Sequence, residues 1–135
     1  MNRIFLDANV LFTAARNPAG KAALVIGLGV KGRWEVVSSS YAAEEARRNI
    51  ALKFPQYQSS LKDLIDSISI IASGSGADCP VKLPEKDRPI MEAAIRSRAT
   101  HLLTGNLRDF GALMNKPRQT AGIVIQTEAE FLSSL

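Results

Sequence analysis

Short apolar runs alternate with longer amphipathic stretches along the chain. The first run, residues 3–6, has no polar alternation and stops at an aspartate, which is typical of a strand that is covered on both faces. Four later runs are also expected to be strands, at residues 34–38, 68–72, 101–103 and 122–126. Because helical stretches separate these runs, the pattern predicts an α/β fold with a parallel sheet and helices on both faces.

The stretches between the strands carry apolar residues at every third or fourth position, the spacing of one helix face. Residues 88–99 form the clearest case. Other helices are expected at residues 10–15, 21–31, 40–53, 56–67, 107–113 and from 127 onward. Ser39 is a candidate N-cap, and Thr127 with Glu130 has the spacing of a capping box.

Length and composition predict a single domain over residues 1–135. No apolar run approaches the roughly 18 residues that cross a bilayer, and Asp7 comes too early for a secretory signal, so no membrane association is expected. Cys79 is the only cysteine, which rules out an internal disulfide and favours a reducing cytoplasm. The net charge of +4 permits a polyanionic partner without identifying one.

Polar side chains that could bind a metal follow the predicted strands, at or soon after the point where each strand ends. The set comprises Asp7, Glu44, Glu45, Asp87, Asn106 and Asp109. Functional sites of open α/β sheets form at the carboxyl ends of the strands, so these side chains are expected to converge at one edge.

Carboxylates that converge repel one another and raise their pKa values unless a cation lies between them. Oxygen ligands alone select Mg²⁺ or Mn²⁺ over Zn²⁺. Such ions activate water and stabilise phosphoryl charge, so the pattern predicts phosphodiester hydrolysis. The sequence has neither an arrangement typical of a covalent nucleophile nor a glycine-rich phosphate loop, and its one histidine, His101, is expected to be structural.

Each acid also has a purely structural interpretation. Asp7 and Asp87 could cap the helices that follow them, with Pro89 in the first turn after Asp87. Glu45 could be a surface residue, and Asp109 could stabilise a helix start. Capping and metal binding are not exclusive, and the joint pattern of acids favours a metal site.

Four segments, in this order and spacing, resemble the PIN domain family. They are FLDANVL at 5–11, SSYAAEEARRNI at 39–50, KDRPIMEAA at 86–94 and HLLTGNLRDFG at 101–111. The closing segment VIQTEAEFL at 124–132 is also similar to the end of such domains. The resemblance covers essentially the whole chain and implies a three-layer α/β/α sandwich around a central parallel sheet of about five strands.

The resemblance also implies an activity and partners. It implies a Mg²⁺- or Mn²⁺-dependent endoribonuclease, most often the toxin of a VapBC-type toxin–antitoxin pair. Such toxins are commonly homodimers and are inhibited by a small cognate antitoxin. The expected partners are therefore an RNA substrate, an antitoxin and a second copy of the chain.

Roles carry over residue by residue. The family's direct metal ligands correspond to Asp7, Glu45 and Asp87. The resemblance selects Glu45 over Glu44, which would point roughly 100° away on the helix. Asn9 and Thr104 would orient ligands or water.

Asn106 departs from the family pattern. The family often has Thr-Gly-Asp where this chain has Thr104, Gly105 and Asn106. Asparagine offers a neutral oxygen but no charge, and Asp109, one turn further on, is expected to act as the fourth catalytic acid. One metal ion is therefore expected, and a second depends on Asp109 or on RNA phosphate.

Basic residues in or beside these motifs are expected to hold the RNA backbone. They are Arg47, Arg48, Arg88 and Arg108, with Lys116 and Arg118 also next to the motifs. Several of them could instead be solvated or paired with nearby acids. An alternative is a catalytically weakened PIN-fold protein that binds RNA or an antitoxin. A metal-dependent phosphoesterase acting on DNA or flap structures ranks lower, because the chain lacks insertions that would clamp structured DNA.

Overall fold

A parallel β-sheet forms the centre of the computed structural model, which describes residues 1–74 and 79–135. Its strands are β1 (Arg3–Leu6), β2 (Glu35–Ser39), β3 (Ser69–Ile71), β4 (His101–Leu103) and β5 (Val124–Gln126). They lie in the order β3-β2-β1-β4-β5, and every neighbouring pair is parallel. The predicted parallel sheet is confirmed.

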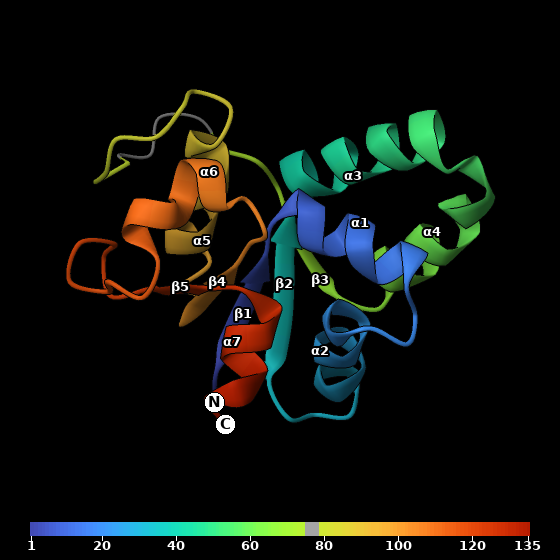
Figure 1. The fold of residues 1–135 in the computed structure, drawn as a ribbon, viewed down its shortest axis with the longest axis horizontal. Coiled ribbons are helices and arrows are strands. Elements are labelled where there is room, and N and C mark those ends of the chain that lie inside the picture. Colours follow the sequence, from blue (N-terminus) through green and yellow to red (C-terminus); the bar gives the residue numbers. More distant parts are fainter. Residues whose placement is uncertain (75–78) are drawn as a thin grey trace.

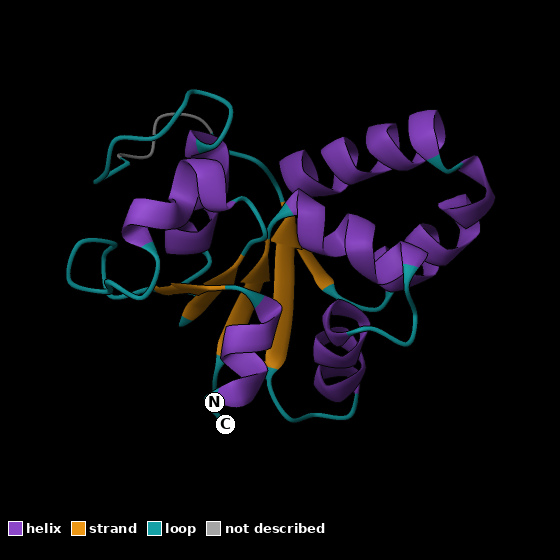
Figure 2. Cartoon of the chain, viewed as in Figure 1, coloured by secondary structure: helices purple, strands orange, loops and turns teal. Residues whose placement is uncertain are grey.

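Helices flank this sheet (Figures 1 and 2). They are α1 (Ala8–Arg16), α2 (Lys21–Val30), α3 (Ser40–Lys53), α4 (Gln58–Asp66), α5 (Arg88–Arg96), α6 (Leu107–Phe110) and α7 (Glu128–Ser133), with 3-10 turns at Pro55–Tyr57 and Gly111–Leu113. In Figure 1, α5 and α6 lie above β4 and β5, and α1, α3 and α4 lie to the right of the sheet. None of the helices in the described ranges is long and apolar enough to cross a membrane.

Strand β1 lies at the centre of the hydrophobic core. Its last three residues, Ile4, Phe5 and Leu6, are completely buried, as the lack of polar alternation predicts. The edge strand β3 differs, because Ser69 and Ile70 are exposed. The fully buried segment is thus the one that leads directly into Asp7.

Capping explains where several helices begin. Helix α1 begins at Ala8, earlier than predicted, because the Asp7 carboxylate accepts a hydrogen bond of 2.7 Å from the Ala8 amide. Ser39 caps α3, and Thr127 forms the expected capping box of α7, so both predictions are confirmed. Helix α5 ends before the predicted residue 99 and is followed by Arg98, whose φ of 59° is incompatible with a right-handed helix.

Two glycines of α2 provide a test of how this helix packs on the sheet. A Cβ atom on Gly29 would collide with Cγ2 of Val36 in β2, whereas a Cβ atom on Gly27 would meet open space. We expect Gly29→Ala to lower the free energy of unfolding by about 1–3 kcal/mol, because overpacking forces the backbone to shift. Gly27→Ala should raise it by up to about 1 kcal/mol, because alanine loses less entropy in a helix. Urea unfolding measures both, and equal effects would contradict the packing described.

Candidate active site

The candidate site lies where the carboxyl ends of β1 and β4 meet. Asp7 follows β1 and Thr104 follows β4, and the Asp7 amide donates a hydrogen bond of 3.0 Å to the carbonyl oxygen of Leu103. Strands β2 and β3 lie on one side of β1, and β4 and β5 lie on the other. The chain therefore changes direction across the sheet between β1 and β4, where α/β proteins form crevices for ligands.

Asp7 is buried, with 3% of its surface exposed, and both its oxygens are hydrogen-bonded. Oδ1 accepts from the Ala8 amide at 2.7 Å, and Oδ2 accepts from Thr104 Oγ1 at 2.8 Å and Asn9 Nδ2 at 3.1 Å. Burial raises the pKa of Asp7, and the charge of Glu45 adds to this, while the hydrogen bonds from Thr104, Ala8 and Asn9 oppose it. The capping interpretation of Asp7 is confirmed and leaves its carboxylate fixed at the strand edge.

Asn9 and Thr104 join the start of α1 to the turn after β4. Asn9 Oδ1 accepts a hydrogen bond of 2.8 Å from the Gly105 amide, and Asn9 Nδ2 lies 3.4 Å from Thr104 Oγ1. Thr104, which is completely buried, also accepts a hydrogen bond of 3.0 Å from the Asn106 amide. These contacts place both residues where they can orient Asp7.

A second group forms around Asn106. Its Nδ2 donates to Asp87 Oδ1 at 3.3 Å and to Asp109 Oδ2 at 3.0 Å, and its Oδ1 caps α6 by accepting from the Asp109 amide at 3.2 Å. Lys86 Nζ lies 3.7 Å from Asp109 Oδ2. Asp87 is 6% exposed, and its Oδ2 is buried without a hydrogen-bond partner among the described residues.

The two carboxyl groups beside Asn106 have opposite pKa shifts. Burial, followed by the neighbouring Asp109, raises the pKa of Asp87 to about 7. The hydrogen bond from Asn106 is the largest cause that lowers the pKa of Asp109, and the neighbouring Asp87 carboxyl adds to it. Asp87 is therefore the member of the pair that retains a proton.

Asp87 does not cap α5 as predicted. Its backbone is already in the right-handed helical region, at φ −98° and ψ −15°, and its side chain makes no capping hydrogen bond. The side chain points instead to the Asn106 amide on the neighbouring turn. The environment of the Asp87 carboxylate is thus set by burial and by the contact with Asn106. The free amide groups at the start of α5 do not contribute to it.

Glu45 approaches the site from α3. It is half-buried, and its charge is close enough to contribute to the raised pKa of Asp7. In residues 1–74 and 79–135, no three aspartate, glutamate, histidine or cysteine side chains form a cluster that could hold a metal ion. The structure therefore places Asp7 with Asn9 and Thr104, places Asp87 with Asn106 and Asp109, and leaves Glu45 as an electrostatic neighbour.

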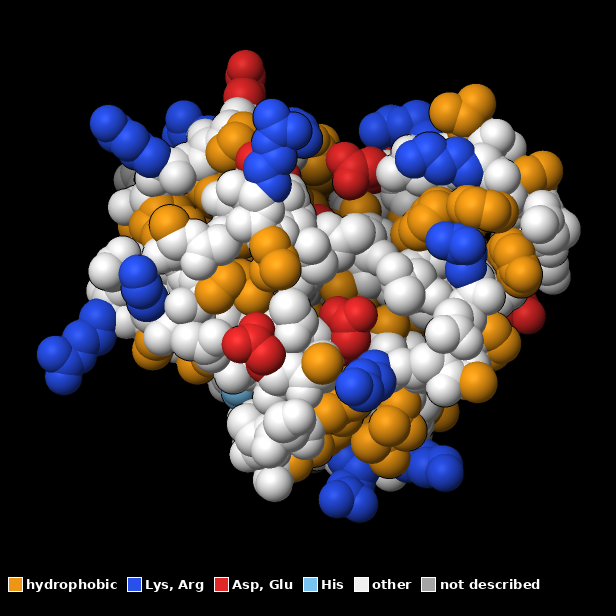
Figure 3. Space-filling view, viewed as in Figure 1, with side chains coloured by type: hydrophobic (Ala, Val, Ile, Leu, Met, Phe, Trp, Pro, Cys, Tyr) orange, Lys and Arg blue, Asp and Glu red, His pale blue; other side chains and the backbone are white. Residues whose placement is uncertain are grey.

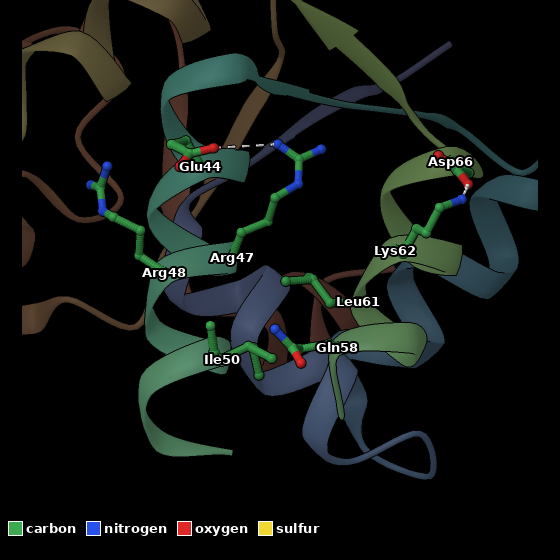
Figure 4. Close-up of a pocket in the computed structure, with 9 residues that line it drawn as sticks. Glu44, Arg47, Arg48, Ile50, Gln58, Leu61, Lys62 and Asp66 are labelled. Carbon is green, nitrogen blue, oxygen red and sulfur yellow. Dashed lines mark hydrogen bonds and ion pairs between the residues drawn. The ribbon is translucent and has the colours of Figure 1, made fainter. Parts of the chain in front are cut away.

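The predicted RNA-binding arginines are all exposed. Arg47 and Arg48 both line a groove of about 500 Å³ between α3 and α4. Arg47 pairs with Glu44 at 3.7 Å, and Figure 4 shows Arg48 extending from the opposite side of α3. Arg48 is near Tyr41, since its charge opposes the rise in the pKa of that phenol, and Arg108 helps to lower the pKa of Asp109. Figure 3 shows lysine and arginine side chains on both sides of the hollow that exposes acidic groups.

The acids do not form a preformed metal cluster in the described residues, but the chemistry of their oxygen donors fits a hard divalent cation. The side chains around the two turns offer oxygen ligands, and Asp87 Oδ2 has no hydrogen-bond partner within residues 1–74 and 79–135. Burial disfavours the charged form of both Asp7 and Asp87, and a nearby cation would reverse that preference.

A family model for the PIN domain matches residues 3–108. This range contains Asp7, Glu45 and Asp87 and ends just before Asp109. The chain belongs to the PIN domain family. No curated protein matches its sequence.

Solved structures with low sequence identity show that this PIN domain has the fold of VapBC proteins. DNA-bound VapBC from Salmonella typhimurium is 17% identical over 95% of this chain and 99% of that chain, with a TM-score of 0.67. VapBC2 from Rickettsia felis, bound to a promoter DNA fragment, is 16% identical over 93% and 98%, with a TM-score of 0.66. VapBC-1 from nontypeable Haemophilus influenzae is 14% identical over 94% and 98%, with a TM-score of 0.59.

Sequence reasoning missed two residues of this PIN domain that contact the acidic turns. Lys86 pairs with Asp109, and Tyr41 donates a hydrogen bond of 2.8 Å to the carbonyl oxygen of Lys86. The apolar periodicity of residues 40–53 predicts only a packing role for Tyr41. Its spacing of four residues from Glu45, which places both side chains on one helix face, is the sequence signal that could have identified it.

The raised pKa of Asp87 predicts that the metal-free protein loses stability as the pH rises. The pKa of Asp87 is about 7 in the folded state against an ordinary value of 3.8, so the folded state binds this proton more tightly. The resulting stabilisation is complete below the unfolded pKa and is lost as the pH rises through about 7. Asp87→Asn should therefore reduce the fall in Tm between about pH 5 and pH 8, measured by thermal unfolding in EDTA.

Asp63→Asn, which removes an exposed carboxylate of α4, is the control and should keep the wild-type pH dependence. The same pH dependence in wild type and Asp87→Asn would contradict the assignment of the proton to Asp87.

Proposed function

We propose that this PIN domain is a divalent-metal-dependent endoribonuclease and the toxin of a toxin–antitoxin pair. The observation that carries the proposal is the burial of two carboxylates, Asp7 and Asp87, while Asp87 Oδ2 has no hydrogen-bond partner in the part of the chain that the structure describes. Two desolvated carboxylates next to a third acid, Asp109, favour binding of a cation over a purely structural role. Membership of a family of nucleases supports hydrolysis as the reaction.

Mg²⁺ or Mn²⁺ would be held by Asp7, Asp87 and Glu45, with Asp109 beside them. When bound, such an ion supplies an activated water and stabilises charge on a phosphodiester. Asn9 and Thr104 fix the orientation of the Asp7 carboxylate through their hydrogen bonds.

The remaining polar residues are proposed to hold the substrate and the second acidic group. Asn106 keeps Asp87 and Asp109 next to each other. The exposed arginines 47, 48, 88 and 108 would contact RNA phosphates, a role that needs charge and reach but no fixed geometry. Arg48 and Arg108, whose charges act on groups of the site, are best placed for phosphates next to the cleaved bond.

The proposed partners follow from the similar structures, which are VapBC assemblies. We propose a small cognate antitoxin as the inhibitor and a homodimer as the state of the toxin. A cytoplasmic location is consistent with Cys79 being the only cysteine.

A catalytically weakened binding module is the second candidate, and Asn106 favours it. The Asn106 amide already donates hydrogen bonds to both Asp87 and Asp109, so a cation would compete with a neutral donor that satisfies them. Binding of RNA or antitoxin with an intact fold but no measurable Mn²⁺ binding at millimolar concentration would support this candidate.

The enzyme proposal predicts that single carboxylate-to-amide changes abolish cleavage. Asp7→Asn and Asp87→Asn should each lower the rate of RNA cleavage in Mn²⁺ by about 100-fold or more, because a neutral amide is a poor ligand for a hard cation. Gel analysis of labelled RNA measures the rate. Asp63→Asn should cleave at the wild-type rate, and wild-type rates in both site variants would exclude the proposed mechanism.

Restoring a carboxylate at position 106 tests whether this residue faces the ion. Asn106→Asp removes the donated hydrogen bonds and adds a negative charge beside Asp87 and Asp109. We expect Mn²⁺ to bind about 10-fold more tightly by calorimetry, while the Tm in EDTA falls. The exposed Asn2→Asp variant should change neither value. An unchanged Mn²⁺ affinity in Asn106→Asp would place residue 106 outside the metal site.

A further inference from the structure

Tyr41 connects two elements that carry different acids of the site. It is the second residue of α3, half-buried, and its ring packs against the hydrophobic core. Its hydroxyl donates a hydrogen bond of 2.8 Å to the carbonyl oxygen of Lys86. That carbonyl belongs to the peptide group that leads into Asp87, so the phenol holds the backbone next to the buried carboxylate.

The same residue shares a helix face with Glu45. Residues four apart in an α-helix lie one above the other, which places the Tyr41 ring and the Glu45 side chain on one side of α3. Burial raises the pKa of Tyr41, and the charges of Glu45, Asp87 and Asp7 add to it. The phenol is therefore within electrostatic reach of all three proposed metal ligands.

The first turn of α3 also holds the other end of the segment that precedes α5. Ser40 Oγ lies 2.7 Å from Ser73 Oγ and accepts a hydrogen bond of 2.9 Å from the Ser73 amide. The Tyr41 amide donates to Ser73 Oγ at 2.9 Å. Both flanks of this segment, at residues 73 and 86, are thus tied to the helix turn that begins α3.

We propose that Tyr41 is a positioning residue that sets the placement of Glu45 relative to Asp87. This inference rests on the proposed function, because it assumes that the two carboxylates bind one metal ion. The Tyr41–Lys86 hydrogen bond is a direct link between the Glu45 helix and the Asp87 backbone. The same hydrogen bond also bears on Asp109, because the ammonium group of Lys86 lies 3.7 Å from Asp109 Oδ2.

The chain contains a matched control, because it has only two tyrosines. Tyr57 lies in the 3-10 turn before α4 and packs against Phe54 with ring centroids 6.4 Å apart. Within the described residues its hydroxyl makes no hydrogen bond to the protein. Both Tyr41→Phe and Tyr57→Phe therefore remove a phenol oxygen. Only Tyr41→Phe also removes a hydrogen bond between two segments of the chain.

The experiment measures Mn²⁺ binding by calorimetry and RNA cleavage for wild type, both phenylalanine variants, Glu45→Gln and the Tyr41→Phe/Glu45→Gln double variant. We expect Tyr41→Phe to weaken Mn²⁺ binding by about 10-fold, because residues that orient metal ligands have effects of this size. The kcat for RNA cleavage should fall, and the KM for RNA should stay unchanged. Tyr57→Phe should match wild type. In the Glu45→Gln background, Tyr41→Phe should cause little further loss, since Tyr41 acts through the placement of Glu45.

Three results would overturn the inference: unchanged Mn²⁺ affinity in Tyr41→Phe, an equal loss in Tyr57→Phe, or additive losses in the double variant. A wild-type protein that binds Mn²⁺ but cleaves no RNA, while Tyr41→Phe still weakens binding, supports the role of Tyr41 and overturns the ribonuclease proposal. A wild-type protein that binds no Mn²⁺ at millimolar concentration overturns both.

Discussion

Burial of two carboxylates at the edge of a parallel sheet is the constraint on which the rest of this site depends. Removing a carboxylate from water disfavours its charged form, and the fold does this twice, at Asp7 and at Asp87. It compensates Asp7 with three hydrogen bonds and leaves one oxygen of Asp87 with no partner among the described residues. The first carboxylate is therefore fixed by the fold, and the second is available to a proton or a cation.

This asymmetry follows from where the two residues sit. Asp7 comes directly after the most deeply buried strand and caps α1, so the fully buried core segment holds it in place. Asp87 ends a long connection and depends on partners from other segments. Asn106 from the turn after β4 holds its side chain, and Tyr41 from α3 holds the backbone beside it. Its position is therefore only as rigid as those contacts.

The features that depend on neighbouring residues and on hydrophobic periodicity could be predicted from the sequence. The buried strand before Asp7, the Ser39 cap and the Thr127–Glu130 capping box all follow from residue type and spacing. The environment of Asp87 could not be predicted in this way. Its cap position and the proline after it suggest an ordinary helix start, yet the raised pKa of Asp87 comes from burial and from Asp109, which only the packed chain brings together. Tyr41 was missed for the same reason, because a half-buried tyrosine also fits an apolar helix position.

Asn106 shows why a neutral side chain can suit a site built from acids. A third carboxylate at this turn would add repulsion to the pair of Asp87 and Asp109. In this pair the pKa of Asp87 is already raised to about 7. The amide donates to both carboxylates and stabilises them together without a cation. The same hydrogen bonds must be weakened or rearranged before an ion can contact those oxygens. In the proposed metal site, position 106 would therefore set a balance between the stability of the metal-free fold and the affinity for metal, and asparagine would favour the fold.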